Sequence, residues 1–277
     1  MTGVIRIVHP FPSTLDAVAT TALVLIAGGP AAVAVQLGVA MLALQAAIGT
    51  TNDLIDEPLD RGRKLGKPLP RGLLSRRTAK SLVAIALIVG LVLSALSGPP
   101  VLAVAVMVVS VGLIYDVWLK GTVWSWLPLA LGIPLLPVYS WLGATGTLPS
   151  AFAVLVPTGV IAGAALALAN VLADLERDIE ADTVTAATRL GALRAWVVNM
   201  VLQAIVVVVA LGSLAATGGR GAGIAVAAFG VLLIAAGVAF GLGRQAGTRE
   251  RAWECQAVGV GLLAVGWVAA LVEAGAL

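Results

Sequence analysis

The segment from Asn52 to Asp60 carries five side chains that end in oxygen donors, namely Asn52, Asp53, Asp56, Glu57 and Asp60. If the segment is helical, Asn52, Asp56 and Asp60 lie four residues apart and share one face with Asp53. Carboxylates so close together raise one another's pKa unless a cation compensates their charge. Oxygen donors suit Mg²⁺, which keeps several waters and completes its shell with phosphate oxygens of a substrate. The spacing therefore predicts a site for magnesium and a diphosphate.

A second acidic segment lies more than a hundred residues further along the chain. Its oxygen-bearing residues recur every four positions, at Asn170, Asp174, Asp178 and Asp182. This spacing predicts another column of oxygens on one helical face, with Glu176 and Glu180 turned towards solvent. Two such columns can face each other across a helix bundle, where two or three cations bridge a diphosphate and polarise its leaving oxygen.

The rest of the chain predicts a membrane environment for these segments. Of its 277 residues, 60% are apolar and 11% are charged, and the mean hydropathy is +1.05. Ordinary soluble domains are about a quarter charged. Several apolar runs reach about 18 residues, the length that crosses a hydrocarbon core. We therefore expect an all-α, polytopic membrane protein, a bundle of nine transmembrane helices that forms a single domain over residues 1–277. The expected spans are 14–29, 31–52, 78–97, 100–119, 123–141, 150–172, 193–216, 222–242 and 254–275.

The basic residues support this topology. With nine spans, every Lys and Arg except Arg220 falls on the side that holds the N-terminus, including the basic run from Arg61 to Lys80. Positive charge collects on the cytoplasmic side of membrane proteins, and such a run also attracts anionic lipid headgroups, at about 1 kcal/mol per charge. The acidic residues gather at the same helix ends, so we expect the active site at the cytoplasmic face. The net positive charge is thereby explained without a nucleic-acid partner.

With these motifs the sequence resembles the UbiA superfamily of intramembrane prenyltransferases. Asn52, Asp53, Asp56 and Asp60 fit its N-D-x-x-D-x-x-x-D pattern in full, and Lys67 to Gly72 is similar to its basic-Pro-Leu-small-Gly stretch. The run from Leu113 to Lys120 resembles the tyrosine-to-lysine segment after span four. Leu175 to Asp182, followed by Thr188 to Gly191, resembles the second aspartate motif and its trailing Arg-Leu-Gly. The resemblance covers nearly the whole chain, although the last three spans contribute only hydropathy.

The resemblance implies Mg²⁺-dependent transfer of a prenyl group from a prenyl diphosphate to a lipophilic acceptor, such as an aromatic compound or a quinone precursor. It implies that Asp56, Asp60, Asp178 and Asp182 are catalytic metal ligands, joined by Asn52, Asp53 and Asp174. It also assigns the diphosphate or acceptor contacts to Asn52, Lys67, Arg71, Tyr115, Lys120 and Arg177. Arg suits bidentate phosphate contact and Lys acts as a point charge. Tyr115 is equally well explained as an interfacial aromatic residue.

Two departures from the family pattern leave questions open. The loop between Asp182 and Thr188 is shorter than usual, so the functional pair is either Asp174 with Asp178 or Asp178 with Asp182. Lys67 stands where Arg is more usual, which implies a looser grip on the diphosphate. His9 is expected to be an ordinary loop histidine, and the many glycines within the spans to mark close helix packing.

Two other functions are compatible with clustered acidic residues in a membrane protein. A terpene cyclase of the same superfamily needs the same metal site but no acceptor pocket, and it stabilises cations with aromatic side chains. The two Tyr and four Phe of this chain favour transfer instead. A cation-coupled transporter places its ion site near the membrane midplane, often between repeated halves, whereas these carboxylates lie at span ends.

Overall fold

The computed structural model describes residues 6–60, 66–243 and 246–277, except for the side chains of Leu59 and Ala246. Every regular element in these ranges is helical. Eight helices are long and apolar enough to cross a membrane, and the apolar helix α2 (Pro10–Ile26) adds a shorter one of 17 residues. The expectation of an all-α, multi-pass membrane protein is thus confirmed. Arg61, Arg63, Lys64 and Arg244 of the expected basic loops lie outside the described residues.

The helices follow the expected spans, with three shifts that matter for function. The helix α2 begins earlier because Pro10 suits the first helical turn, where a backbone N–H has no partner. The helix α3 continues to Asp60, and the last helix begins at Ala246 instead of 254. The helices after α2 are α3 (Ala31–Asp60), α4 (Arg76–Ala95), α5 (Pro99–Ile114), the π-helical turn η1 (Tyr115–Leu119), α6 (Leu127–Thr145), α7 (Phe152–Ala173), α8 (Leu175–Glu180), α9 (Ala186–Leu190), α10 (Ala192–Thr217), α11 (Ala222–Phe240) and α12 (Ala246–Glu273).

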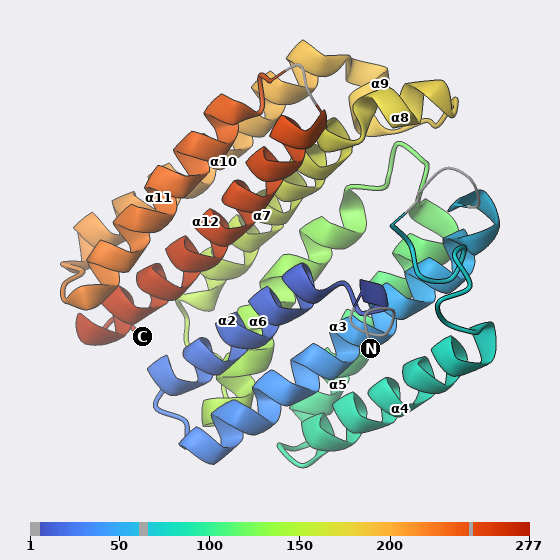
Figure 1. The fold of residues 1–277 in the computed structure, drawn as a ribbon. Helices are drawn as coiled ribbons and strands as arrows, with labels where there is room; N and C mark the ends of the chain where they lie inside the picture. Colours follow the sequence, from blue (N-terminus) through green and yellow to red (C-terminus); the bar gives the residue numbers. More distant parts are fainter. Residues whose placement is uncertain (1–5, 61–65, 244–245) are drawn as a thin grey trace. The chain divides into compact units, whose positions relative to one another are not determined.

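The first of two compact units comprises Met1–Trp118 and Leu136–Thr147. In this unit α3 packs against α2, α4 and α5, and Figure 1 shows it between α2 and α4. Its apolar face is fully buried at Leu37, Met41 and Leu44. A polar contact joins two helices of the unit: Gln45 of α3 donates to Asp16 of α2 over 2.5 Å. Such bonds are required of polar groups that face neighbouring helices.

The second unit comprises Leu119–Leu135 and Leu148–Leu277. There α7 packs against α10 and α12, and α11 lies along α12. A Cβ added to Gly230 of α11 would lie 2.5 Å from the backbone nitrogen of Leu263, and one on Gly266 of α12 would lie 2.3 Å from that of Ala227. The two backbones approach this closely because both helices present glycine at the contact. The expectation that glycines mark close packing is confirmed for this pair.

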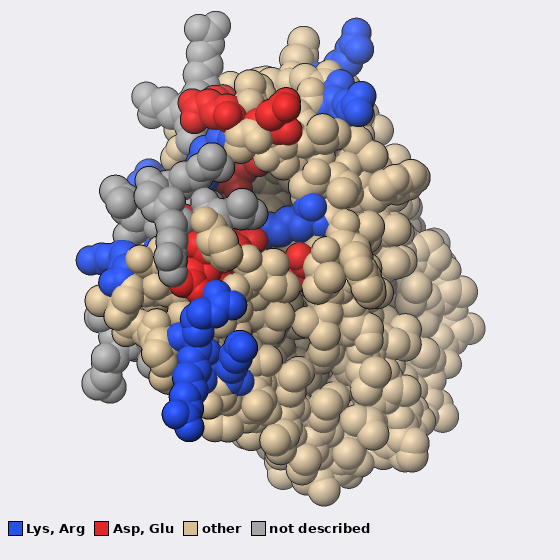
Figure 2. Space-filling model, turned by 90° about the vertical axis from the view of Figure 1, so that its right-hand side faces the viewer, with Lys and Arg blue, Asp and Glu red and all other residues tan. Residues whose placement is uncertain are grey.

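The surface agrees with a lipid environment. Most of the face in Figure 2 is formed by uncharged residues. The helix α4 is the least buried of the eight candidate spans, and Ile85, Ile88 and Val92 are exposed on it. The two acidic segments lie at the end of α3 and just after α7.

Candidate functional site

The first acidic segment forms the last turns of α3, as its spacing predicts. The side chains of Asp53, Asp56, Glu57 and Asp60 are all buried, with 2% to 5% of their surface exposed. Carboxylates are rarely buried unless they are paired or hold a metal ion. The helix continues through Pro58, whose missing N–H interrupts only the final turn. This segment therefore holds four buried carboxylates at one end of a membrane span.

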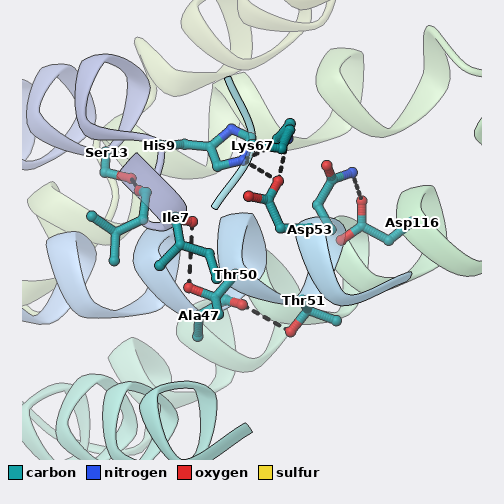
Figure 3. Close-up of polar contacts among 11 residues, drawn as sticks. Ile7, His9, Ser13, Ala47, Thr50, Thr51, Asp53, Lys67 and Asp116 are labelled. Atoms are coloured by element: carbon teal, nitrogen blue, oxygen red, sulfur yellow. Dashed lines mark hydrogen bonds and ion pairs between the residues drawn. The ribbon is translucent and has the colours of Figure 1, made fainter. Parts of the chain in front are cut away.

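Asp53 accepts hydrogen bonds from two residues outside α3 (Figure 3). Nε2 of His9, just before α2, lies 2.9 Å from Oδ1 of Asp53. Lys67, in the loop after α3, pairs with the same oxygen. The other oxygen of Asp53, Oδ2, is buried and has no hydrogen-bond partner within the described part of the chain. Asp53 thus ties three chain segments together and keeps one buried acceptor unused.

Asn52 faces another acidic residue, on the element that follows α5. Its Nδ2 donates to Oδ1 of Asp116 over 2.7 Å. Asp116 is buried within the π-helical turn η1, and Tyr115 of the same turn is half-buried, as is Lys120 one residue beyond it. Short π-helical turns inside longer helices often occur at functional sites. The structure thereby brings Asn52 to the turn that carries Asp116, a contact that the sequence does not indicate.

The start of α4 provides a partner for another carboxylate of α3. Arg76 forms an ion pair with Glu57, whose side chain is buried. Arg71, which precedes α4, is exposed. Ser75 caps α4 by accepting a hydrogen bond from the backbone N–H of Thr78 over 3.0 Å. One expected diphosphate ligand, Lys67, is therefore held at α3, whereas Arg71 is open to solvent.

The second acidic segment does not form the continuous stripe that its spacing predicts. The helix α7 ends before Asp174, and α8 contains Asp178 but ends before Asp182. Asp182 has a left-handed backbone, with φ at 51°. Its N–H bonds the carbonyl of Ile179, and the N–H of Thr183 bonds that of Asp178. This is the pattern of a Schellman motif, which ends a helix at a residue with positive φ, and Asp tolerates that conformation better than most residues.

The exposures within this second segment also differ. Asn170, Asp174 and Asp178 are half-buried, while Asp182 is exposed. Glu176 and Glu180 are exposed, as expected. The expectation that these residues form one helical column is therefore wrong. Asp174 and Asp178 keep a helical relation, since the N–H of Asp178 donates to the carbonyl of Asp174 over 2.9 Å.

Two arginines hold this segment. Arg177 pairs with Asp174 three residues earlier on the chain. Arg249 of α12, only 6% exposed, pairs with Glu176 of α8. The hydrogen bond from Arg249 keeps the pKa of Glu176 below its usual value. Arg249 had been expected only as a basic loop residue, and it lies in α12 because that helix begins earlier than its hydropathy suggests.

Within the described ranges, no three His, Cys, Asp or Glu side chains form a group able to hold a metal ion. The structure does pair Asn52 with Asp116, Asp53 with Lys67 and Asp174 with Arg177. The contact of His9 with Asp53 was not predicted from the sequence, because a lone histidine near the chain start gives no signal for it.

The sequence and the fold both match known proteins. A model of the UbiA prenyltransferase family matches residues 17–272. Comparison with curated protein sequences gives no match. The fold resembles a digeranylgeranylglyceryl phosphate synthase, with a TM-score of 0.72 and 15% identity over 98% of this chain and 97% of that one.

Two further solved structures have similar folds. A UbiA homolog from Aeropyrum pernix K1, in its apo form, has a TM-score of 0.75 and 19% identity over 91% of this chain and 96% of that chain. A UbiA homolog from Archaeoglobus fulgidus, bound to GPP and Mg²⁺, has a TM-score of 0.74 and 16% identity over 96% of this chain and 99% of that chain. The TM-scores show that the folds are alike, and at identities this low the likeness is one of fold alone.

Proposed function

Because this chain belongs to the UbiA prenyltransferase family, we propose that it transfers a prenyl group from a prenyl diphosphate to a lipophilic acceptor, with Mg²⁺, inside the membrane. An aromatic compound or a quinone precursor is the proposed acceptor. The proposal extends to the side of the membrane: the basic residues follow the positive-inside pattern, which supports an active site at the cytoplasmic face in contact with lipid headgroups.

The observation that carries this proposal is the buried acidic end of α3. Asp53, Asp56 and Asp60 are at most 5% exposed at the end of a span that is otherwise apolar. Ionisable residues in such a position are expensive and mark functional sites by default. The oxygen donors also suit Mg²⁺, and the buried Oδ2 of Asp53, unused among the described residues, is available to a cation. The donor chemistry of this segment and this buried oxygen of Asp53 therefore support the proposed metal.

The proposed metal ligands come from both acidic segments. They are Asn52, Asp53, Asp56 and Asp60 of the first, and Asp174, Asp178 and Asp182 of the second. Mg²⁺ held by these residues would neutralise the diphosphate and make it a better leaving group. Asp56, Asp60, Asp178 and Asp182 are the residues whose loss we expect to be most damaging.

The basic residues serve the diphosphate itself in this proposal. Lys67, Arg71, Lys120 and Arg177 donate to its non-bridging oxygens, and Tyr115 contacts the diphosphate or the acceptor. The bond between the prenyl carbon and the diphosphate oxygen breaks, and the allylic cation that remains is captured by the acceptor, which then loses a proton. The apolar helices shield that cation from water.

Product analysis tests the proposal directly. Purified protein in lipid is incubated with Mg²⁺ and prenyl diphosphates of graded length, with and without a panel of acceptors. The panel includes aromatic compounds and a prenylated glyceryl phosphate, because one similar fold is that of a digeranylgeranylglyceryl phosphate synthase. We expect adducts that form only when an acceptor is present. Cyclic hydrocarbons or alcohols formed without an acceptor would instead establish a terpene cyclase, and ion flux without diphosphate release would establish a transporter.

A further inference from the structure

The side chain of His9 packs against α3 and contacts Asp53. A carboxylate only accepts hydrogen bonds, so the contact of 2.9 Å requires that Nε2 of His9 donates to Oδ1 of Asp53. Lys67 donates to the same oxygen, and its Nζ lies 3.5 Å from Nε2 of His9. Two donors from different parts of the chain therefore share one oxygen of a buried carboxylate, as Figure 3 shows.

The position of the imidazole is determined by packing. A Cβ added at Gly49 of α3 would lie 3.0 to 3.2 Å from atoms of the His9 side chain, so the absence of a side chain at Gly49 makes room for the ring. The backbone of His9 is left-handed, with φ at 49°, a strained conformation for a residue other than glycine. Such strain persists where the surroundings over-determine it, and it clusters at functional sites.

Neighbouring contacts hold this strained residue. Oγ of Ser13 donates to the carbonyl of Val8 over 2.7 Å, and the N–H of Ser13 bonds the carbonyl of His9 over 3.2 Å. Ile7 is fully buried in a cluster with Leu69, two residues after Lys67. The segment before α2 and the loop that carries Lys67 are thus packed together at the end of α3.

We propose that His9 is a positioning residue that remains the partner of Asp53 when Lys67 turns to the diphosphate. Asp53 is only 2% exposed, and a buried carboxylate that loses its sole partner is strongly destabilised. If Lys67 were the sole donor to Oδ1, its movement to the substrate would leave that oxygen without a donor, since the proposed cation is assigned to Oδ2. Because His9 donates to the same oxygen, Asp53 keeps a hydrogen-bond donor when Lys67 leaves it to bind the diphosphate. This inference rests on the proposed function for the identity of the ligand that Lys67 meets.

Two substitutions separate the hydrogen bond from the backbone strain. Asn suits a left-handed backbone, but in His9→Asn the amide is too short to reach Asp53. In His9→Gln the amide reaches the place of Nε2. We expect His9→Asn to raise the KM for the prenyl diphosphate about tenfold, because the lost hydrogen bond weakens binding of the substrate. We expect kcat to stay within about twofold of wild type. We expect His9→Gln to recover most of the loss. Gly49→Ala would place a Cβ 3.0 to 3.2 Å from the His9 side chain and press on the ring while His9 is intact, so it should raise KM in the same direction.

A labelling measurement distinguishes this role from a structural one without using activity. Amine-reactive labelling of the folded protein in detergent is followed by mass spectrometry, with exposed Lys80 as the internal reference. In His9→Asn we expect Lys67 to react more slowly than in wild type, because Asp53 then holds it alone. Faster labelling of Lys67 would show that His9 merely fastens the loop, and an unchanged KM in His9→Asn would also overturn the inference. If wild-type protein releases no diphosphate from any prenyl diphosphate, the proposed function fails, and the labelling arm still decides the role of His9.

Discussion

The carboxylates of the first segment have different partners although they lie within eight residues of α3. Asp53 is tied to His9 and Lys67, and Glu57 to Arg76. Asp56 and Asp60, equally buried, lie on the face that the sequence assigns to a metal. A buried carboxylate beside a basic partner is stabilised by that partner. Asp53 and Glu57 therefore contribute to the stability of the fold as well as to any chemistry. We choose Asp56 to test metal binding because it lies four residues from both Asn52 and Asp60 in the proposed ligand set.

Asp56→Asn and Asp178→Asn are each expected to lower Mg²⁺-dependent diphosphate release about a hundredfold or more, since even outer-shell partners of a metal contribute 10- to 100-fold. Asn has the same shape, so circular dichroism and thermal unfolding should resemble those of wild type. Glu180→Gln is the matched control, because Glu180 is exposed and lies outside the proposed ligand set. Wild-type rates in both Asp variants would refute the metal assignment.

At the level of elements, helix ends decide where the second acidic segment lies. The turn at Asp182 is built by two backbone bonds that need a positive φ. The four-residue spacing predicted a helical stripe through Asp182. The spacing gives no sign of the left-handed backbone at Asp182, before which the helix ends. By contrast, α3 runs unbroken to Asp60, so the first acidic segment keeps the helical intervals on which its interpretation depends. Helical spacing therefore does not decide whether Asp174 and Asp178 or Asp178 and Asp182 form the functional pair, and activity measurements are needed to decide it.

Asp182→Gly decides whether Asp182 contributes its carboxylate or only its turn. Glycine adopts positive φ without strain, so this variant should unfold at the same temperature as wild type or slightly above it. If Asp182 is a metal ligand, diphosphate release should fall about a hundredfold and a higher Mg²⁺ concentration should be needed. Full activity in Asp182→Gly would leave Asp174 and Asp178 as the functional pair.

The α11–α12 contact gives an element-level test of stability. Gly230→Ala would place a Cβ 2.5 Å from the backbone of Leu263 and push the helices apart, with an expected loss of about 1–3 kcal/mol. Gly212→Ala is the control, since a Cβ there meets open space and alanine favours helix by about 1 kcal/mol. Thermal unfolding in detergent measures both. Equal unfolding temperatures would contradict the close packing of α11 on α12.

At the level of the whole molecule, hydropathy predicted the membrane-spanning helices, and the acidic spacing is consistent with the helical end of α3. Both are local properties, which a single sequence carries. Long-range contacts were not predictable in this way: His9 and Asp53 are 44 residues apart, and Asn52 and Asp116 are 64 apart. Nothing in the spacing of those residues encodes their contact, because it depends on how α2, α3 and α5 pack.

The central claim is that this membrane protein ionises a prenyl diphosphate with Mg²⁺. The most direct measurement is diphosphate release by wild-type protein in lipid vesicles, with graded prenyl diphosphates and the acceptor panel, before and after removal of divalent cations by EDTA. Diphosphate release is expected to stop with EDTA and to return when Mg²⁺ is added back. Release that continues unchanged in EDTA, or none with any substrate and acceptor, would contradict the claim.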